Sequence, residues 1–84
     1  MNISEIFQEL KNRLKNQNEM VKYANLTLAK SFKLDETKNI LQLFYSKDYL
    51  FIVQKLRTPE SSELIEKILF DITGKNIKAK FEIN

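Results

Sequence analysis

Hydrophobic and polar residues follow regular periods in the last third of the chain, and this pattern predicts a helix followed by a strand. Thr58 can cap the helix, and Pro59 fits its first position, where the missing N–H costs nothing. Gly74 stands where a helix commonly ends in a left-handed residue. From Ile77 to Ile83 apolar residues occupy every second position, as in a half-buried strand. The predicted buried stripe of the helix is Leu64, Ile65, Ile68, Leu69 and Ile72.

The beginning of the chain predicts two helices. Asn2 and Glu5 have the spacing of a capping box, with Ser4 as the competing cap. A second, shorter helix is expected from about Glu19 to Asn25. The apolar face of the first helix is Ile3, Ile6, Phe7, Leu10 and Leu14, and the second should bury Met20, Val21 and Ala24.

Two strands are expected in the middle of the chain. The first should run near Leu28–Leu34, where apolar residues favour even positions. Leu28 also lies four residues after Ala24, so a longer preceding helix is the alternative. Asp35–Asn39 is polar and has the length of a hairpin turn, although it contains no glycine. Ile40–Tyr45 is almost continuously apolar, as in a central strand covered on both faces.

A third helix is expected between this strand and Pro59. Ser46 can serve as its N-cap, and Lys55–Pro59 ends it, because the residue before a proline is pushed out of helical geometry. Its predicted buried stripe is Tyr49, Ile52, Val53 and Leu56. The complete order is helix, helix, strand, strand, helix, helix, strand, which predicts a small α+β domain with three strands sharing one core.

Composition narrows the possible functions. The 84 residues suit a single domain, and the net charge of +3 comes from 14 basic and 11 acidic side chains. Cysteine and histidine are both absent, which excludes disulfides and removes the commonest metal ligands and catalytic base. We expect no metal and no cofactor. No apolar run approaches the roughly 20 residues that a spanning helix needs, so we expect a cytoplasmic protein without membrane contact.

Carboxylates are the only conventional catalytic groups present in number. Glu60, Glu63 and Glu66 lie on successive turns of the last helix and could in principle act as an acid/base set. We interpret them as a solvated helix face whose first acids favour the positive end of the helix dipole. Gly74–Asn76 is not a phosphate-binding loop, because it follows a helix and lacks a second glycine. The sequence therefore predicts a domain that is not an enzyme.

Nucleic-acid binding is an alternative that depends on five lysines. Lys75, Lys78 and Lys80, with Lys30 and Lys33, would have to gather at a sheet edge. A chain with one glycine cannot contain the GXXG clamp of a KH module. Its aromatic residues also do not interleave with the lysines as stacking platforms would. We therefore do not expect direct nucleic-acid binding.

Protein contact is the better-supported class of function. Phe70 lies about opposite the buried stripe of its helix and shares a face with Glu63, Glu66 and Lys67. Phe51 is similarly off the stripe of the third helix. An exposed phenylalanine with a charged rim is typical of an interface anchor, and the alternative is that another part of the chain covers each ring.

The segment Ile40–Phe81 also resembles a known family. It joins an apolar strand, an aromatic-containing helix, the run LRTPESSELIE over residues 56–66, one glycine and a closing strand. In these features it resembles the C-terminal domain of the bacterial DNA polymerase III gamma/tau subunit, the clamp-loader ATPase subunit. The tryptophan often found near the start of the family's first helix is missing, with Ile6 and Phe7 in its region. Domain I of the replication initiator DnaA shares the element order but lacks the break at Thr58–Glu60, so we rank it second.

Either resemblance implies a KH-like α+β domain, with about four helices packed on a three-stranded sheet, that binds other proteins. The gamma/tau resemblance implies that residues 1–84 belong to a longer replication protein whose ATPase motifs lie elsewhere. The domain would tether the polymerase α subunit, or the replicative helicase, to the clamp loader. The DnaA resemblance implies an N-terminal interaction and oligomerisation domain.

Overall fold

The computed structural model describes all 84 residues and confirms the predicted α+β fold and element order. In chain order the elements are α1 (Ile3–Asn16), α2 (Met20–Thr27), β1 (Ser31–Asp35), β2 (Ile40–Tyr45), the 3₁₀ turn η1 (Lys47–Tyr49), α3 (Leu50–Leu56), α4 (Pro59–Thr73) and β3 (Lys78–Ile83). None of the helices combines the length and the apolar sequence needed to span a bilayer.

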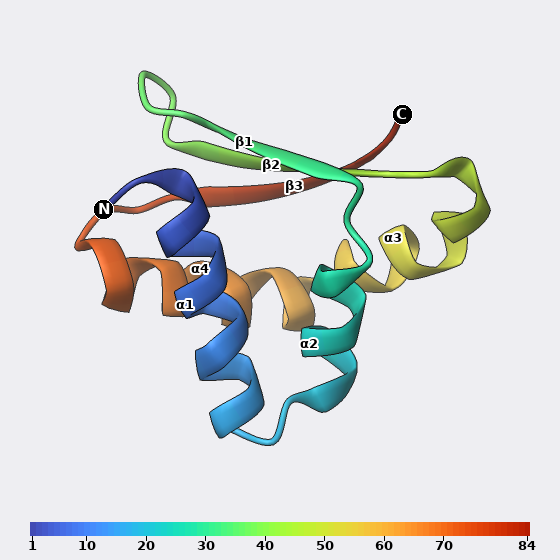
Figure 1. Cartoon of the computed structure of the whole chain (residues 1–84), viewed down its shortest axis with the longest axis horizontal. Helices are drawn as coiled ribbons and strands as arrows, with labels where there is room; N and C mark the ends of the chain where they lie inside the picture. Colours follow the sequence, from blue (N-terminus) through green and yellow to red (C-terminus); the bar gives the residue numbers. More distant parts are fainter.

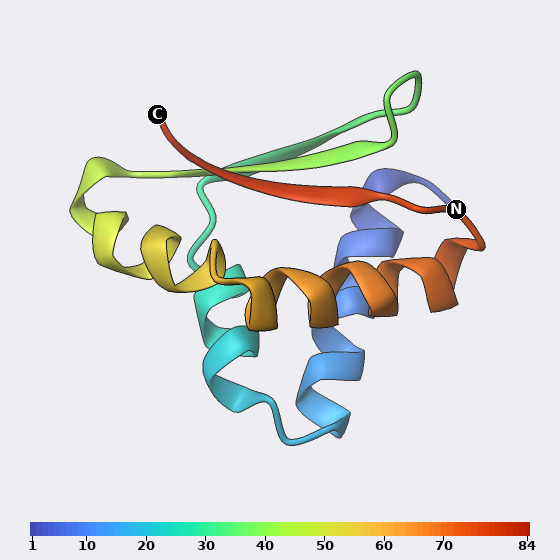
Figure 2. The same cartoon turned by 180° about the vertical axis from the view of Figure 1, so that it is seen from behind.

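The three strands form one mixed sheet in the order β1-β2-β3. The central strand β2 pairs antiparallel with β1 and parallel with β3, and α3 and α4 make the crossover between the two parallel strands. The helices lie on one face of the sheet and leave the other face open (Figures 1 and 2). The prediction that β2 is covered on both faces is therefore wrong, because only its alternate residues Leu41, Leu43 and Tyr45 are buried.

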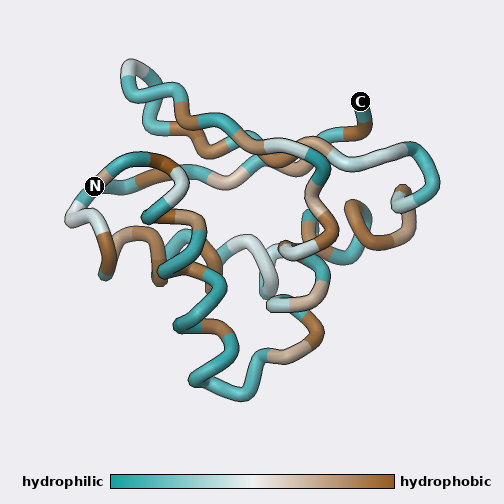
Figure 3. Tube along the Cα trace, in the orientation of Figure 1, coloured by the Kyte–Doolittle hydropathy of each residue, from teal (hydrophilic) through white to brown (hydrophobic).

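The hydrophobic core lies between the sheet and the helices. All 15 buried residues are hydrophobic, so no charged group has to be accommodated inside. The predicted stripes of α1, α3 and α4 all face this core or pack against it. Figure 3 shows how hydrophobic and hydrophilic residues alternate along α1, as expected of a helix with one buried face. Ile83, which we expected on the buried side of β3, is instead partly exposed at the end of the chain.

Tyr45 joins the central strand to the C-terminal end of α2. Its side chain is completely buried, and its hydroxyl donates a hydrogen bond of 2.7 Å to the carbonyl oxygen of Asn25. This carbonyl belongs to the last turn of α2, where carbonyls lack partners within the helix. Burial disfavours the phenolate and raises the pKa of Tyr45 above its ordinary value.

The helix ends largely follow the predicted local signals. Asn2 and Glu5 form the capping box, with hydrogen bonds of 2.9 and 3.1 Å. Gly74 adopts a left-handed conformation with φ of 73° and ends α4. Ser46 accepts a hydrogen bond from the Asp48 N–H, but the helix it caps begins with η1 before α3.

Two predictions about helix and strand starts need correction. Thr58 occupies the N-cap position of α4, but its hydroxyl donates back to the carbonyl of Lys55 at 2.9 Å and does not cap the helix. The first strand begins at Ser31 and not near Leu28, which instead caps the C-terminus of α2 with helical backbone angles. The hairpin manages without glycine because Asn39 takes the left-handed conformation, with φ of 54°.

The predicted buried side of α2 is wrong. Met20, Val21 and Ala24 are all exposed, Val21 by 67%, and Leu26 is the buried residue. Lys22 faces inward instead, with only 13% of its side chain exposed.

Two carboxylates hold Lys22 in this position. Its ammonium donates a hydrogen bond of 3.1 Å to Glu19 and lies 3.5 Å from a carboxylate oxygen of Glu60 on α4. The hydrogen bond to Glu19 is the main cause that raises the pKa of Lys22. Lys22 thus links the start of α2 to α4.

Candidate functional site

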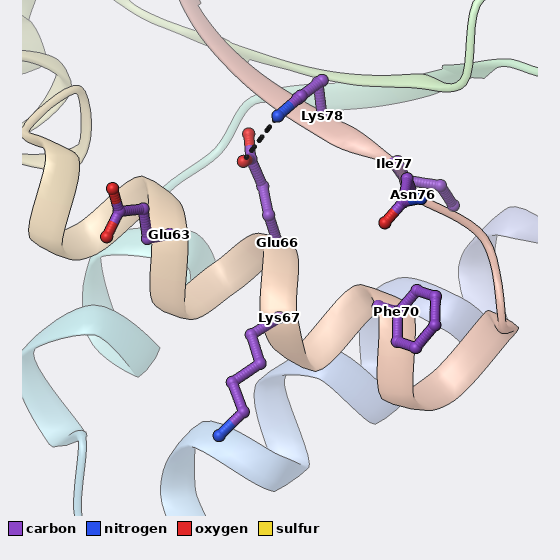
Figure 4. Close-up of a pocket in the computed structure, with 7 residues that line it drawn as sticks. All are labelled: Glu63, Glu66, Lys67, Phe70, Asn76, Ile77 and Lys78. Atoms are coloured by element: carbon purple, nitrogen blue, oxygen red, sulfur yellow. Dashed lines mark ion pairs between the residues drawn. The ribbon is translucent and has the colours of Figure 1, made fainter.

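A groove between α4 and the start of β3 gathers four of the predicted contact residues. It has a volume of about 300 Å³ and contains the exposed face of α4 on one side. α4 runs along β3, and the segment after Gly74 turns the chain back to form the other side (Figure 2). The lining residues are Glu63, Glu66, Lys67, Phe70, Asn76, Ile77 and Lys78 (Figure 4).

Helical spacing explains why the α4 residues share the groove. Glu63, Glu66, Lys67 and Phe70 are separated by three or four positions, so they project from the same side of the helix. This side is opposite the buried residues that hold α4 on the core. Phe70 is 46% exposed, which confirms that the chain does not cover its ring completely.

Glu66 is already engaged within the fold. One of its carboxylate oxygens accepts a hydrogen bond of 3.0 Å from the N–H of Ala79, and the other lies 3.6 Å from the ammonium of Lys78 (Figure 4). β3 is an edge strand, so Glu66 supplies an acceptor that a neighbouring strand would otherwise provide. Glu63 and Lys67 are exposed, and Lys67 extends away from β3 in Figure 4. Phe70, Glu63 and Lys67 are therefore the exposed residues that α4 contributes to the groove.

Phe51 does not belong to this groove. It lies on α3 and is 65% exposed, as the sequence predicted. The ammonium of Lys55 lies 4.5 Å from the centre of its ring, in the range of a cation–π contact. The two exposed phenylalanines thus occupy separate places on the molecule, and only Phe70 has a groove beside it.

The carboxylates of α4 have different partners. Glu60 faces Lys22 of α2, whereas Glu66 faces the start of β3. Nowhere do three or more possible metal-ligating side chains come together. The groove offers one apolar ring and charges of both signs, which are the elements of a contact surface.

The lysines of the nucleic-acid alternative are only partly brought together. Lys78 and Lys80 lie on the open face of the sheet, and the register places Lys33 on that same face. Lys30 and Lys75 lie in the connections before β1 and β3.

The open face of the sheet also carries an aromatic residue that the sequence pattern did not predict there. We expected no aromatic side chain among the lysines, but Phe44 shares their side of the sheet. Successive side chains of a strand point to opposite faces of the sheet, so the position of Phe44 next to the buried Leu43 could have indicated that Phe44 lies on the open face.

Comparisons with known proteins add no relative. No family model, curated protein or solved structure matches this chain.

Proposed function

We propose that this chain is a non-catalytic protein-binding domain whose contact surface is the α4–β3 groove around Phe70. The observation that carries this proposal is the half-exposed phenylalanine at the groove, with Glu63 and Lys67 on the same helix face. A ring that is partly desolvated and has an open hollow beside it can bury further apolar area against a partner. The charged neighbours would orient that partner.

The resemblance of residues 40–81 to the gamma/tau C-terminal domain supplies the proposed partner. In this proposal the domain works in the cytoplasm as part of the bacterial replisome and tethers the polymerase α subunit, or the replicative helicase, to the clamp loader. If the chain is instead domain I of the initiator DnaA, the same surface would serve assembly of the initiation complex. In both proposals the side chains of the groove bind a partner protein, and neither proposal includes a catalysed reaction.

The test compares Phe70→Ala with the matched variant Phe51→Ala. Both remove an exposed phenylalanine from a helix, but only Phe70 lines the groove. Binding of each variant to the purified polymerase α subunit and to the helicase should be measured by biolayer interferometry. We expect Phe70→Ala to weaken binding to one of them by about tenfold or more, and Phe51→Ala to leave it nearly unchanged.

Thermal denaturation of both variants provides the control for folding. Since Phe70 is half-exposed, its truncation should cost only about 1 kcal/mol of stability, well below a full core deletion. Equal binding by the wild type and a folded Phe70→Ala variant would show that the groove is not the contact surface.

A further inference from the structure

The open face of the sheet carries a regular arrangement of cationic, amide and aromatic side chains. The pairing register sets three rows across the strands: Lys33–Gln42–Lys80 in the middle, Ser31–Phe44–Glu82 on one side and Asp35–Ile40–Lys78 on the other. Neighbouring strands lie about 4.8 Å apart, so the backbones at Lys33 and Lys80 are separated by about 10 Å. No helix covers these rows (Figures 1 and 2).

The two lysines of the middle row are available to a ligand. Lys33 and Lys80 are exposed, and neither takes part in the four ion pairs of the structure. Lys78 is also 71% exposed, although it reaches over the sheet edge toward Glu66. The Phe44 ring is partly exposed one row away, on the central strand between the two free lysines.

The carboxylates of this face weaken its positive charge only partly. Asp35 is engaged by the hairpin, where its carboxylate accepts hydrogen bonds of 3.0 and 3.1 Å from the N–H groups of Thr37 and Lys38. Glu82 lies beside Phe44 on the edge strand. The middle row itself contains no acid.

We propose that this open face binds single-stranded nucleic acid. Lys33 and Lys80 contact phosphates, Phe44 stacks on an unpaired base, and the Gln42 amide lies between the lysines, where it can hydrogen-bond a base or a sugar. Cations that flank an aromatic ring on an open surface are what single-strand binding needs, because every base offers a stacking face. A duplex keeps its bases inside the helix and cannot use Phe44 in this way. None of these four residues lines the α4–β3 groove, so nucleic-acid binding and the proposed protein contact can be tested independently.

Fluorescence anisotropy with labelled oligothymidine, oligouridine and a DNA duplex tests the proposal. We expect both single strands to bind at 50 mM salt, more tightly than the duplex. Two phosphate contacts to a single strand predict that affinity falls about sevenfold between 50 and 200 mM salt. The DNA and RNA probes also show whether a 2′-hydroxyl contributes to binding.

Three variants separate the parts of the site. Lys80→Gln should reduce the salt effect to about 2.5-fold, because one phosphate contact remains. Phe44→Leu should weaken binding by about fivefold or more at unchanged salt dependence, whereas Phe44→Tyr should retain it. Lys67→Gln, on α4, is the matched control for loss of one positive charge.

No binding of single strands at 50 mM salt would overturn the proposal. Equal affinity of the folded Phe44→Leu variant and the wild type would overturn it as well. The proposal is also overturned if Lys67→Gln weakens binding as much as Lys80→Gln. In that case nucleic acid would be attracted only by the net positive charge of the protein.

Discussion

Replacing Tyr45 by phenylalanine tests whether the central strand holds the end of α2 through one hydrogen bond. The substitution keeps the buried ring and removes only the hydroxyl that donates to Asn25. A typical hydrogen bond contributes about 1 kcal/mol, and leaving the partner carbonyl partly buried without a donor adds to the loss. We therefore expect the free energy of unfolding at pH 7 to fall by about 1 to 2 kcal/mol.

Thermal and urea denaturation followed by circular dichroism measure this loss. For a domain of this size, about 1.5 kcal/mol corresponds to a decrease of Tm by about 6 to 12 °C. Tyr49→Phe is the matched control, because Tyr49 packs against the same core but is not the tyrosine that reaches Asn25. A Tyr45→Phe variant as stable as the wild type would show that α2 does not depend on this bond.

The same residue gives a pH dependence with a definite sign. Burial raises the pKa of Tyr45 above its ordinary value of about 10, so the unfolded chain loses this proton before the folded one does. The contribution of Tyr45 is complete below pH 10 and is lost as the pH rises further. The wild type should therefore lose its advantage in unfolding free energy over Tyr45→Phe as the pH is raised from 9 to about 11. Above pH 10 this loss should approach about 1.4 kcal/mol per pH unit. A constant difference over this range would contradict the burial argument.

Two further predictions concern local structure. Gly74→Ala should lower the free energy of unfolding by about 1 kcal/mol, because φ is 73° and an added Cβ meets no atom within 4 Å, so only backbone strain acts. Urea denaturation should show a smaller loss of stability for Gly74→Asn, because asparagine tolerates the left-handed conformation better than alanine. Equal losses for the two variants would argue against backbone strain. Val21→Glu should change stability by less than about 0.5 kcal/mol, whereas Leu26→Ala should cost about 2 to 5 kcal/mol. The reverse order in thermal melts would restore the original prediction for α2.

The sequence alone determined the elements that depend on residues three or four positions apart. The capping box at Asn2, the left-handed stop at Gly74 and the buried stripe of α4 are all local, because each needs only neighbours within one helical turn. The outward position of Phe70 follows from the same spacing. The residues of the candidate groove that come from α4 were predictable for this reason.

Tertiary structure decided whatever required a partner from another element. The eight-residue helix α2 is short, and its Lys22 lies between the nearby Glu19 and Glu60 of α4, which the sequence does not place beside it. Glu66 became part of the fold because β3 brings an unpaired N–H beside it. The meeting of Phe44 with Lys33 and Lys80 depends on strand register and on the placement of every helix on one face. Such contacts join residues that are far apart in the chain. The local spacing of residues therefore cannot predict them, because it does not specify how separate helices and strands pack together.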